Sequence, residues 1–459
     1  TVAPQCGTTL TLGESGDTVT LGSGASQSGF GRTGTVNWQT GSIKTSTFTA
    51  VNGEGYFVNT TGGAVTVNLP AGSAGDIVAF KDYAGTWDTN SVIVTPNGSD
   101  KVNGTASNAN LTTEAQSVTL IFVDSTKGWL DIHDSQSNVI GAQYVAATGG
   151  NTVITDGNFK THVFTGPGTF CVSSAGNPGG STKVDYVVIA GGGSGGVNCA
   201  GGGGGAGGFR LSNCVGSIPA PTMSPLVKSC GGITVSVTGY PITVGGGGAG
   251  RPNSAGNEGI KGSDSVFSTI TSTGGGKGSG TSSGNGGSGG SGGGGAHSSG
   301  CGASGNTPSV SPPQGNDGGD ATPSSVGGDD CGGGGGGAGA AADGSSNPQG
   351  GIGSFVADSF FGPTAPSYGE AGPVSNTRYF AGGGGGGARG GPTPAGSTDG
   401  GIGGGGNGAR GPSGSGGPES SGTANTGGGG GGAVGPGGGY TPSGGGGSGI
   451  VMIRYKFQN

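Results

Sequence analysis

Glycine makes up 124 of the 459 residues, and most of it lies after residue 190 in uninterrupted runs. Ordering a glycine backbone costs more conformational entropy than ordering any other residue, so this composition is typical of disordered or low-complexity chains. Here, however, the last run is followed at 449–457 by an apolar segment with the pattern of a strand. We therefore predict that the glycine is ordered and enclosed in a β domain. The pure runs are 201–205, 292–295, 332–337, 382–387, 427–432 and 444–447.

The charge content also disfavours disorder, because only 9% of the residues are charged and disordered chains usually carry far more charge. The net charge is −7, and no basic stripe indicates a nucleic-acid-binding surface. The sequence has no run of about 18 apolar residues, so we expect no membrane span. Val, Thr, Ile, Ser and Gly dominate over helix formers, which predicts an all-β fold of tandem β domains. Because the chain begins with Thr1 and shows no signal peptide, we expect a processed chain or an excerpt of a longer one.

Residues 1–45 carry a near-repeat, TLTLG at 9–13 and TVTLG at 18–22. Each unit alternates apolar and polar residues and ends in glycine, as short strands joined by tight turns do. Such strands bury little surface alone and gain a core from identical neighbours wound around one axis. We therefore predict that 1–45 is a shaft segment and that the chain forms a homotrimer.

Residues 46–140 have the pattern of a compact β spacer domain. Turn-forming residues at 70–72, 96–98 and 127–128 separate short apolar segments. Trp87 and Trp129 are its large apolar anchors. The predicted strands are 56–59, 64–69, 76–81, 91–96, 117–124 and 129–133.

Residues 155–273, completed by 449–459, are predicted to form a β-sandwich-like frame. The terminal strand 450–457 is expected to pair with the earlier strands of this frame, which makes 274–448 one long glycine-rich insertion. The other predicted strands are 162–164, 169–172, 183–190, 233–237, 242–244 and 266–270.

The insertion 274–448 is either disordered or ordered in its own way, since a structureless loop of that length within a domain would be anomalous. The ordered form would be polyglycine II, an extended threefold helix that rises about 3.1 Å per residue. Without Cβ atoms such rods pack closely and bond through backbone N–H and C=O groups. The matched lengths of the runs favour this lattice, with the non-glycine inserts as loops at the rod ends.

Two motifs resemble ligand sites, and the sequence supports neither. Residues 187–196 (VVIAGGGSGG) match a strand followed by G-x-G-x-x-G, but no helix signal and no acidic residue about 20 positions later follows. The acidic stretches 316–320 (NDGGD) and 329–330 lack the nine-residue spacing of calcium-binding repeats. We interpret them as solvated loop carboxylates, with a cation between loops as the alternative. The prediction is no cofactor and no metal site.

Catalysis is not expected. Of three histidines, His133 shares a strand face with Asp131 but has no nucleophile or second histidine nearby in sequence. No carboxylate pair stands out as a glycan-hydrolysing site, so we predict that the chain is not an enzyme. The seven cysteines include no C-x-x-C pair, which disfavours zinc, and they are either free thiols or loop-stapling disulfides. They are Cys6, Cys171, Cys199, Cys214, Cys230, Cys301 and Cys331.

Aromatic residues among the glycine runs are the candidates for receptor binding. They lie where almost nothing else is apolar, and they either fill the margins of the lattice or stand at its tip and contact a sugar or protein surface. These residues are Phe355, Phe360, Phe361, Tyr368, Tyr379, Phe380 and Tyr440.

Three stretches resemble the glycine-rich domains at the C-termini of phage tail fibres, of the marine and cyanobacterial phage type. They are KVDYVVIAGGG at 183–193, the segment 201–209 and SGIVMIRY at 448–455. The stretches 65–70 (VTVNLP), 75–87 and 123–129 resemble a β domain common in the same proteins.

The resemblance implies a virion tail-fibre adhesin that attaches a phage to its host through loops of the C-terminal domain. Its expected partners are identical chains, other phage tail proteins and a host surface glycan or outer-membrane protein. It is similar in kind to the T-even-type adhesins that bundle polyglycine helices, but their frame differs, so no receptor residue carries over. The alternative is a structural glycine-rich filament without receptor binding, and a polysaccharide depolymerase ranks third.

Overall fold

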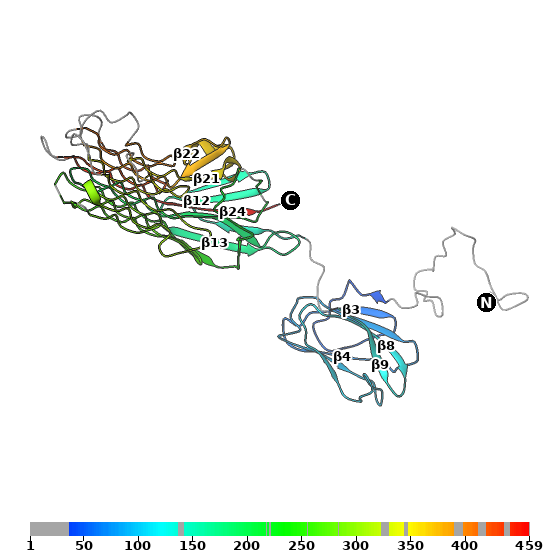
Figure 1. The fold of residues 1–459 in the computed structure, drawn as a ribbon. Helices are drawn as coiled ribbons and strands as arrows, with labels where there is room; N and C mark the ends of the chain where they lie inside the picture. Colours follow the sequence, from blue (N-terminus) through cyan, green and yellow to red (C-terminus); the bar gives the residue numbers. More distant parts are fainter. Residues whose placement is uncertain are drawn as a thin grey trace, which may run out of the picture. The chain divides into compact units, whose positions relative to one another are not determined.

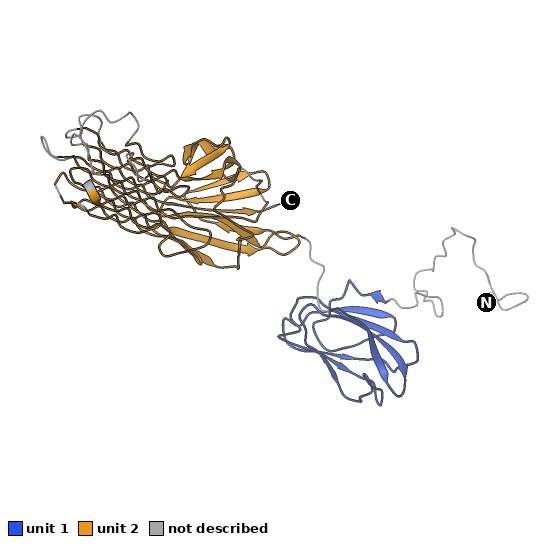
Figure 2. Ribbon diagram, in the orientation of Figure 1, with its two compact units in different colours: residues 1–140 blue, residues 141–459 orange. Residues whose placement is uncertain are grey.

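The computed structural model describes residues 36–135 and 142–458, apart from 217, 220–221, 255, 283, 323–329, 344–347, 390–397, 412–418 and 436–440. The chain divides into two compact units between Ile140 and Gly141 (Figures 1 and 2). Strands dominate both units. The helical segments of the described part are short 3-10 turns at His297–Ser299, Asp358–Phe360 and Gly362–Ser367. The predicted all-β fold class is confirmed. None of the described helical segments has the length and apolar character that a membrane crossing requires.

The first unit has two sheets that enclose one core. One sheet has the order β1-β3-β5-β8-β9 and the other β2-β4-β6-β7. Both contain parallel pairs, β3 with β5 and β4 with β6. The strands are β1 (Asn37–Trp38), β2 (Phe48–Thr49), β3 (Glu54–Val58), β4 (Val65–Asn68), β5 (Ile77–Asp82), β6 (Val92–Thr95), β7 (Ala109–Leu111), β8 (Ser117–Asp124) and β9 (Gly128–Ser135).

The predicted anchors Trp87 and Trp129 lie at the centre of this core, both fully buried. The Trp87 indole N–H donates to the carbonyl oxygen of Val58 at 3.2 Å, which satisfies its polar atom. Val36, at the start of the described chain, is also buried, against Ile77 and Ala79. The structure therefore places residues 36–45 with this unit, although the sequence pattern assigned them to a shaft. The rest of the predicted shaft lies outside the described residues.

The second unit has a sandwich of two larger sheets. Their orders are β11-β12-β24-β14-β15-β16, with β17 also paired to β14, and β10-β13-β18-β19-β20. The strands are β10 (Val145–Thr148), β11 (Thr152–Asp156), β12 (Phe159–Phe164), β13 (Gly168–Ala175), β14 (Lys183–Ile189), β15 (Phe209–Asn213), β16 (Val227–Ser229), β17 (Ile233–Thr234), β18 (Gly239–Thr243), β19 (Ser265–Phe267), β20 (Ile270–Ser272) and β24 (Ile450–Lys456).

The terminal strand β24 lies between β12 and β14 and is antiparallel to both. Its side chains alternate between two cores: Met452 packs on one face of the sheet, and Ile453 and Tyr455 pack between the two sheets. The predicted pairing of this strand with the frame is thus confirmed, and it occupies a central position.

The glycine-rich segments continue from the ends of these strands and form a net of extended chains (Figure 1). In segment 191–197, three successive backbone N–H groups donate to three different neighbouring segments, and the fourth donates to the first neighbour again. Each neighbour is therefore contacted by every third residue. A β-strand alternates between two sides, so its hydrogen bonds repeat every two residues instead. The pairs are Gly191 to Ser263, Ser194 to Ile260 and Val197 to Asn257; Gly192 to Gly447 and Gly195 to Gly444; Gly193 to Gly205 and Gly196 to Gly202.

Segment 201–208 repeats this rotation with other neighbours, two antiparallel and one parallel. The pairs are Gly201 to Ala433, Gly204 to Gly430 and Gly207 to Gly427; Gly202 to Ser279, Gly205 to Gly276 and Gly208 to Thr273; Gly203 to Gly333 and Ala206 to Gly336. The segments 191–208 and 245–264 therefore belong to the net, which begins well before the predicted insertion at 274.

Close approach of the segments excludes side chains at most of these positions. A Cβ placed on Gly203 would overlap the carbonyl oxygen of Gly384, and one on Gly429 would overlap that of Gly204. Backbone atoms thus take the place that side chains fill in an ordinary core.

A small sheet, β21-β23-β22, interrupts the glycine-rich region. Its strands are β21 (Ser354–Ala357), β22 (Glu370–Ala371) and β23 (Thr377–Phe380). Val356 and Phe380 pack against Met452 and Phe209 of the large sheet. This sheet lies within 274–448, where the sequence pattern predicted only glycine segments and loops.

Two neighbouring glycines test the packing of the net. Gly247→Ala is expected to lower the free energy of unfolding by about 1–3 kcal/mol, because its Cβ would overlap the carbonyl oxygen of Gly446. Gly246→Ala is the matched control, since no atom lies within 4 Å of its Cβ, and we expect a change within about 0.5 kcal/mol. Thermal or denaturant unfolding measures both, and equal stability of the two variants would contradict tight packing at this position.

Candidate functional site

The glycine segments run out from the strands and back again, so their turns meet at an end remote from the sandwich. Segment 191–197 leaves β14, turns at 198–200 and returns as 201–208 to β15; segment 244–250 leaves β18, turns at 251–256 and returns to β19. A bridge between Val197 and Asn257 places the two turns side by side. We call this end, with the described residues of the turns 198–200, 251–254, 281–282 and 297–300, the distal end.

The chain on either side of several sequence inserts also reaches the distal end. Ala200 bridges Val434, and Cys331 bridges both Thr322 and Ala388, which in turn bridges Arg410. The non-glycine inserts that follow the outgoing segments therefore begin close together. These inserts are separated by tens of residues in the sequence. They begin near one another because the glycine segments that lead to them run in the same direction.

Two side-chain contacts link segments at or next to the distal end. His297 Nε2 lies 3.2 Å from Asp330 Oδ2, and Lys277 Nζ lies 3.0 Å from Glu258 Oε2. Burial alone would raise the pKa of Glu258, but hydrogen bonds from Lys277 and Thr281 and the charge of Lys277 outweigh it and hold this pKa below its usual value. Glu258 is therefore ionised at neutral pH and links adjacent segments.

The acidic stretch at 316–320 bonds to neighbouring backbone. Asp317 Oδ1 accepts the N–H of Gly305 and Asp320 Oδ1 accepts that of Gly302, both at 2.8 Å. Among the described residues no three His, Cys, Asp or Glu side chains come together as metal ligands do. Segment 191–196 is likewise extended and leads into no helix, so it lacks the helix N-terminus that a dinucleotide site requires.

The six candidate receptor-binding aromatics that the structure describes do not lie at the distal end. Phe360, Phe361 and Phe380 are buried in the core between the large sheet and β21–β23, and Tyr379 is 5% exposed. These four rings fill the margin of the glycine-rich region and present no surface to a receptor. Phe355 and Tyr368 are half-buried, the first beside Tyr379 and the second stacked on Phe361 at 5.5 Å. Tyr440 lies outside the described residues.

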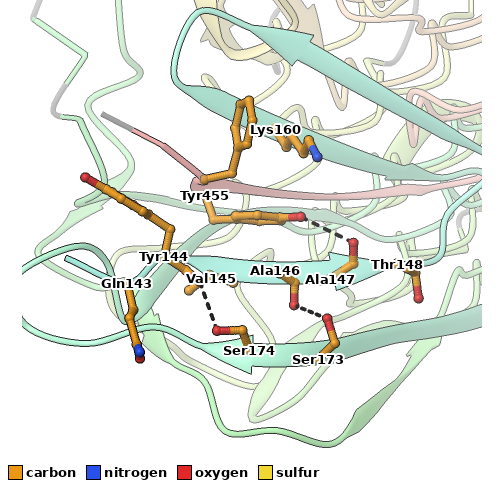
Figure 3. A pocket seen from close by; sticks show the side chains of 11 residues that line it. Gln143, Tyr144, Val145, Ala146, Ala147, Thr148, Lys160, Ser173, Ser174 and Tyr455 are labelled. Atoms are coloured by element: carbon orange, nitrogen blue, oxygen red, sulfur yellow. Dashed lines mark hydrogen bonds between the residues drawn. The ribbon is translucent and has the colours of Figure 1, made fainter. Parts of the chain in front are cut away.

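A groove of about 660 Å³, which we call the edge groove, opens among the strands of the sandwich (Figure 3). The strand β10 forms one wall, and β12 and β24 form the other. The lining residues are 143–148, Lys160, Ser173, Ser174, Tyr455 and Phe457. No local sequence signal marks this groove, because its walls come from strands far apart in the chain.

His162 lies directly behind the edge groove and is 1% exposed. Its ring stacks on Tyr455 with centroids 5.6 Å apart, and its Nδ1 and Nε2 lie 2.7 Å from the Gly149 carbonyl oxygen and 3.1 Å from the Tyr455 hydroxyl. Burial lowers the pKa of His162, the bond to Gly149 opposes this, and the charge of Lys160 adds to the lowering. The neutral ring is therefore the form that holds Tyr455 in place.

Models of two protein families match the chain. The model of a glycine-rich domain matches residues 165–456, well over half of the chain. The chain belongs to this family. The model of the N-terminal part of the bacteriophage T4 gp9/10-like proteins matches residues 14–140. A search of curated proteins found no match.

Together these matches make the chain a phage tail-fibre protein with a C-terminal glycine-rich region, and the resemblance found in the sequence is confirmed. The T4 gp9/10-like match places it among the structural proteins of the phage tail, and therefore in the virion. That match also spans the residue 45 boundary that the sequence pattern suggested between shaft and spacer.

The lowered pKa of His162 predicts a loss of stability in acid. The unfolded state takes up a proton near pH 6.5 whereas the folded state resists it, so the stabilisation is complete above 6.5 and declines as the pH falls below that value. Differential scanning calorimetry between pH 7.5 and 4.5 measures the decline. His162→Gln, which cannot titrate, should flatten the slope, and an unchanged slope would assign the acid sensitivity to other groups.

Proposed function

We propose that this tail-fibre protein is an adhesin that attaches the virion to a host-cell surface through the loops of its distal end. The observation that carries the proposal is the convergence, at one end of the second unit, of the described turns and of the residues that flank several non-glycine inserts. The segments that support these inserts are joined by backbone hydrogen bonds to several neighbours each. A scaffold of this kind fixes the points at which each loop begins and ends, which lowers the entropic cost of binding.

The contrast between the glycine segments and the turns that join them supports recognition by the loops. The glycine segments tolerate almost no side chain, whereas the turns between them carry exposed polar residues such as Asn253 and Ser282. Variation in the turns therefore leaves the scaffold unchanged. A purely structural filament remains the second candidate function, because a hydrogen-bonded glycine net also makes a rigid element.

Adhesion in this scheme needs no chemistry. Each distal end makes weak contacts, and a homotrimer presents three of them, so that simultaneous binding raises the overall affinity. The receptor is a surface glycan or an outer-membrane protein of the host, and the fibre acts outside the cell.

The glycine segments are, in this proposal, polyglycine II helices. The rotation of N–H groups among three neighbours supports this, because polyglycine II has three residues per turn. A diffraction experiment is expected to give φ near −75° and ψ near +145° along 201–208, with a rise of about 3.1 Å per residue. A flat β conformation with φ near −140° would contradict it.

Bulky substitutions at the distal end should abolish attachment. Asn253→Arg combined with Ser282→Arg places two long side chains on exposed turns, and we expect the purified protein to lose at least about tenfold of its potency as a competitor of phage adsorption. The matched control is Ser288→Arg, an exposed serine on the flank of the same hairpin, for which no loss is expected. Unchanged competition by the double variant, with thermal stability retained, would favour the filament.

A further inference from the structure

The edge groove differs from the rest of the chain in charge. The chain carries 24 acidic and 17 basic residues, yet none of the described residues that line the groove is acidic, and Lys160 lies among them. A second hollow of about 260 Å³ adjoins it at Asn177 and Ser181, which bond to the backbone of Gln143, and it is lined by Lys183 and Lys456. A basic track on an acidic protein indicates an anionic ligand.

Aromatic rings hold the ammonium groups of this track. Lys160 Nζ lies 4.5 Å from the centroid of the Phe457 ring, and Lys456 Nζ lies 5.8 Å from that of Tyr144. Both rings are half-buried, and Figure 3 shows Tyr144 extending outward from the end of β10. A cation–π contact fixes the position of a lysine without neutralising it, so the charge of Lys160 stays available to a ligand.

The wall formed by β10 is poorly suited to pair with a peptide strand. The carbonyl oxygens of Tyr144 and Ala146 already accept hydrogen bonds from the hydroxyl groups of Ser174 and Ser173. The Val145 N–H likewise donates to Ser181 Oγ at 3.1 Å. Strand addition relies on free backbone groups of this kind, so a peptide is disfavoured as the occupant.

The groove therefore offers apolar rings, lysine ammonium groups and the exposed polar side chains of Gln143 and Thr148. A pyranose ring carries an apolar face that packs on an aromatic ring, and hydroxyl groups that bond to polar side chains. A carboxylate on the same sugar would pair with Lys160. We propose that the edge groove binds an acidic oligosaccharide, at a site separate from the distal end.

Binding of a defined oligosaccharide to the full chain tests the proposal. Isothermal titration calorimetry with hexagalacturonate is expected to detect binding that weakens with added salt, while neutral maltohexaose binds at least about tenfold more weakly. Lys160→Gln should weaken hexagalacturonate binding about two- to fivefold and reduce its salt dependence, as loss of one exposed ion pair does. Tyr144→Ala should weaken binding of the acidic ligand at every salt concentration.

Matched controls lie in the first unit. Tyr83 is 57% exposed and Lys127 is exposed, so Tyr83→Ala and Lys127→Gln remove the same groups from another surface and should leave binding unchanged. Absence of hexagalacturonate binding by the folded protein would overturn the proposal, as would equal losses in the control variants. Equally tight binding of an oligothymidylate would assign the groove to nucleic acid instead.

The two sets of variants test the edge groove and the adhesin proposal separately. The double variant Asn253→Arg and Ser282→Arg should keep its affinity for hexagalacturonate, and Lys160→Gln should keep its potency in the adsorption assay. If hexagalacturonate binding is lost in the distal-end variant, the ligand binds at the distal end and the edge groove is not its site.

Discussion

The approach of one backbone to another without intervening side chains is the constraint on which the second unit depends. A Cβ at Gly203 or Gly429 would overlap a carbonyl oxygen of the next segment. Removing the side chains allows each N–H to reach a different neighbour in rotation, so that hydrogen bonds extend in several directions and not within a single sheet. The entropic cost of ordering glycine is offset only when many segments are held together, which is why the net is continuous with the strands of the frame.

The frame and the net stabilise the second unit through different interactions. Apolar burial is concentrated in the sandwich, where Tyr186, Phe170 and Phe267 lie between the two large sheets. The net contributes backbone hydrogen bonds and ion pairs such as Lys277 with Glu258. A phage tail-fibre protein built in this way can change the turns of its distal end while both sources of stability remain.

Much of the frame could be predicted from the sequence because alternating apolar residues and turn residues are local signals. The predicted strand 117–124 coincides with β8, and 183–190 differs from β14 by one residue. The predicted strand 266–270 is instead a hairpin of β19 and β20, because Ser268 adopts a positive φ of 52° between them. The sheet β21–β23 was missed because its short apolar stretches lie within glycine. Filling of the lattice margin by Phe360 and Phe380 was one of two alternatives that the sequence left open, and it could not be chosen because their neighbours Val163 and Met452 come from distant parts of the chain.

The central place of β24 delays closure of the large sheet until the end of synthesis. Ile189 of β14 pairs with Ile450, so the large sheet cannot close until the whole glycine-rich region has left the ribosome. Until then β12 and β14 present unpaired edges, which are prone to join other chains. A contact this distant in sequence also closes slowly. The glycine hairpins between 191 and 264 join strands that are already made, but many of their hydrogen-bond partners, such as Gly430 and Gly447, are synthesised later, so the net closes together with the final strand.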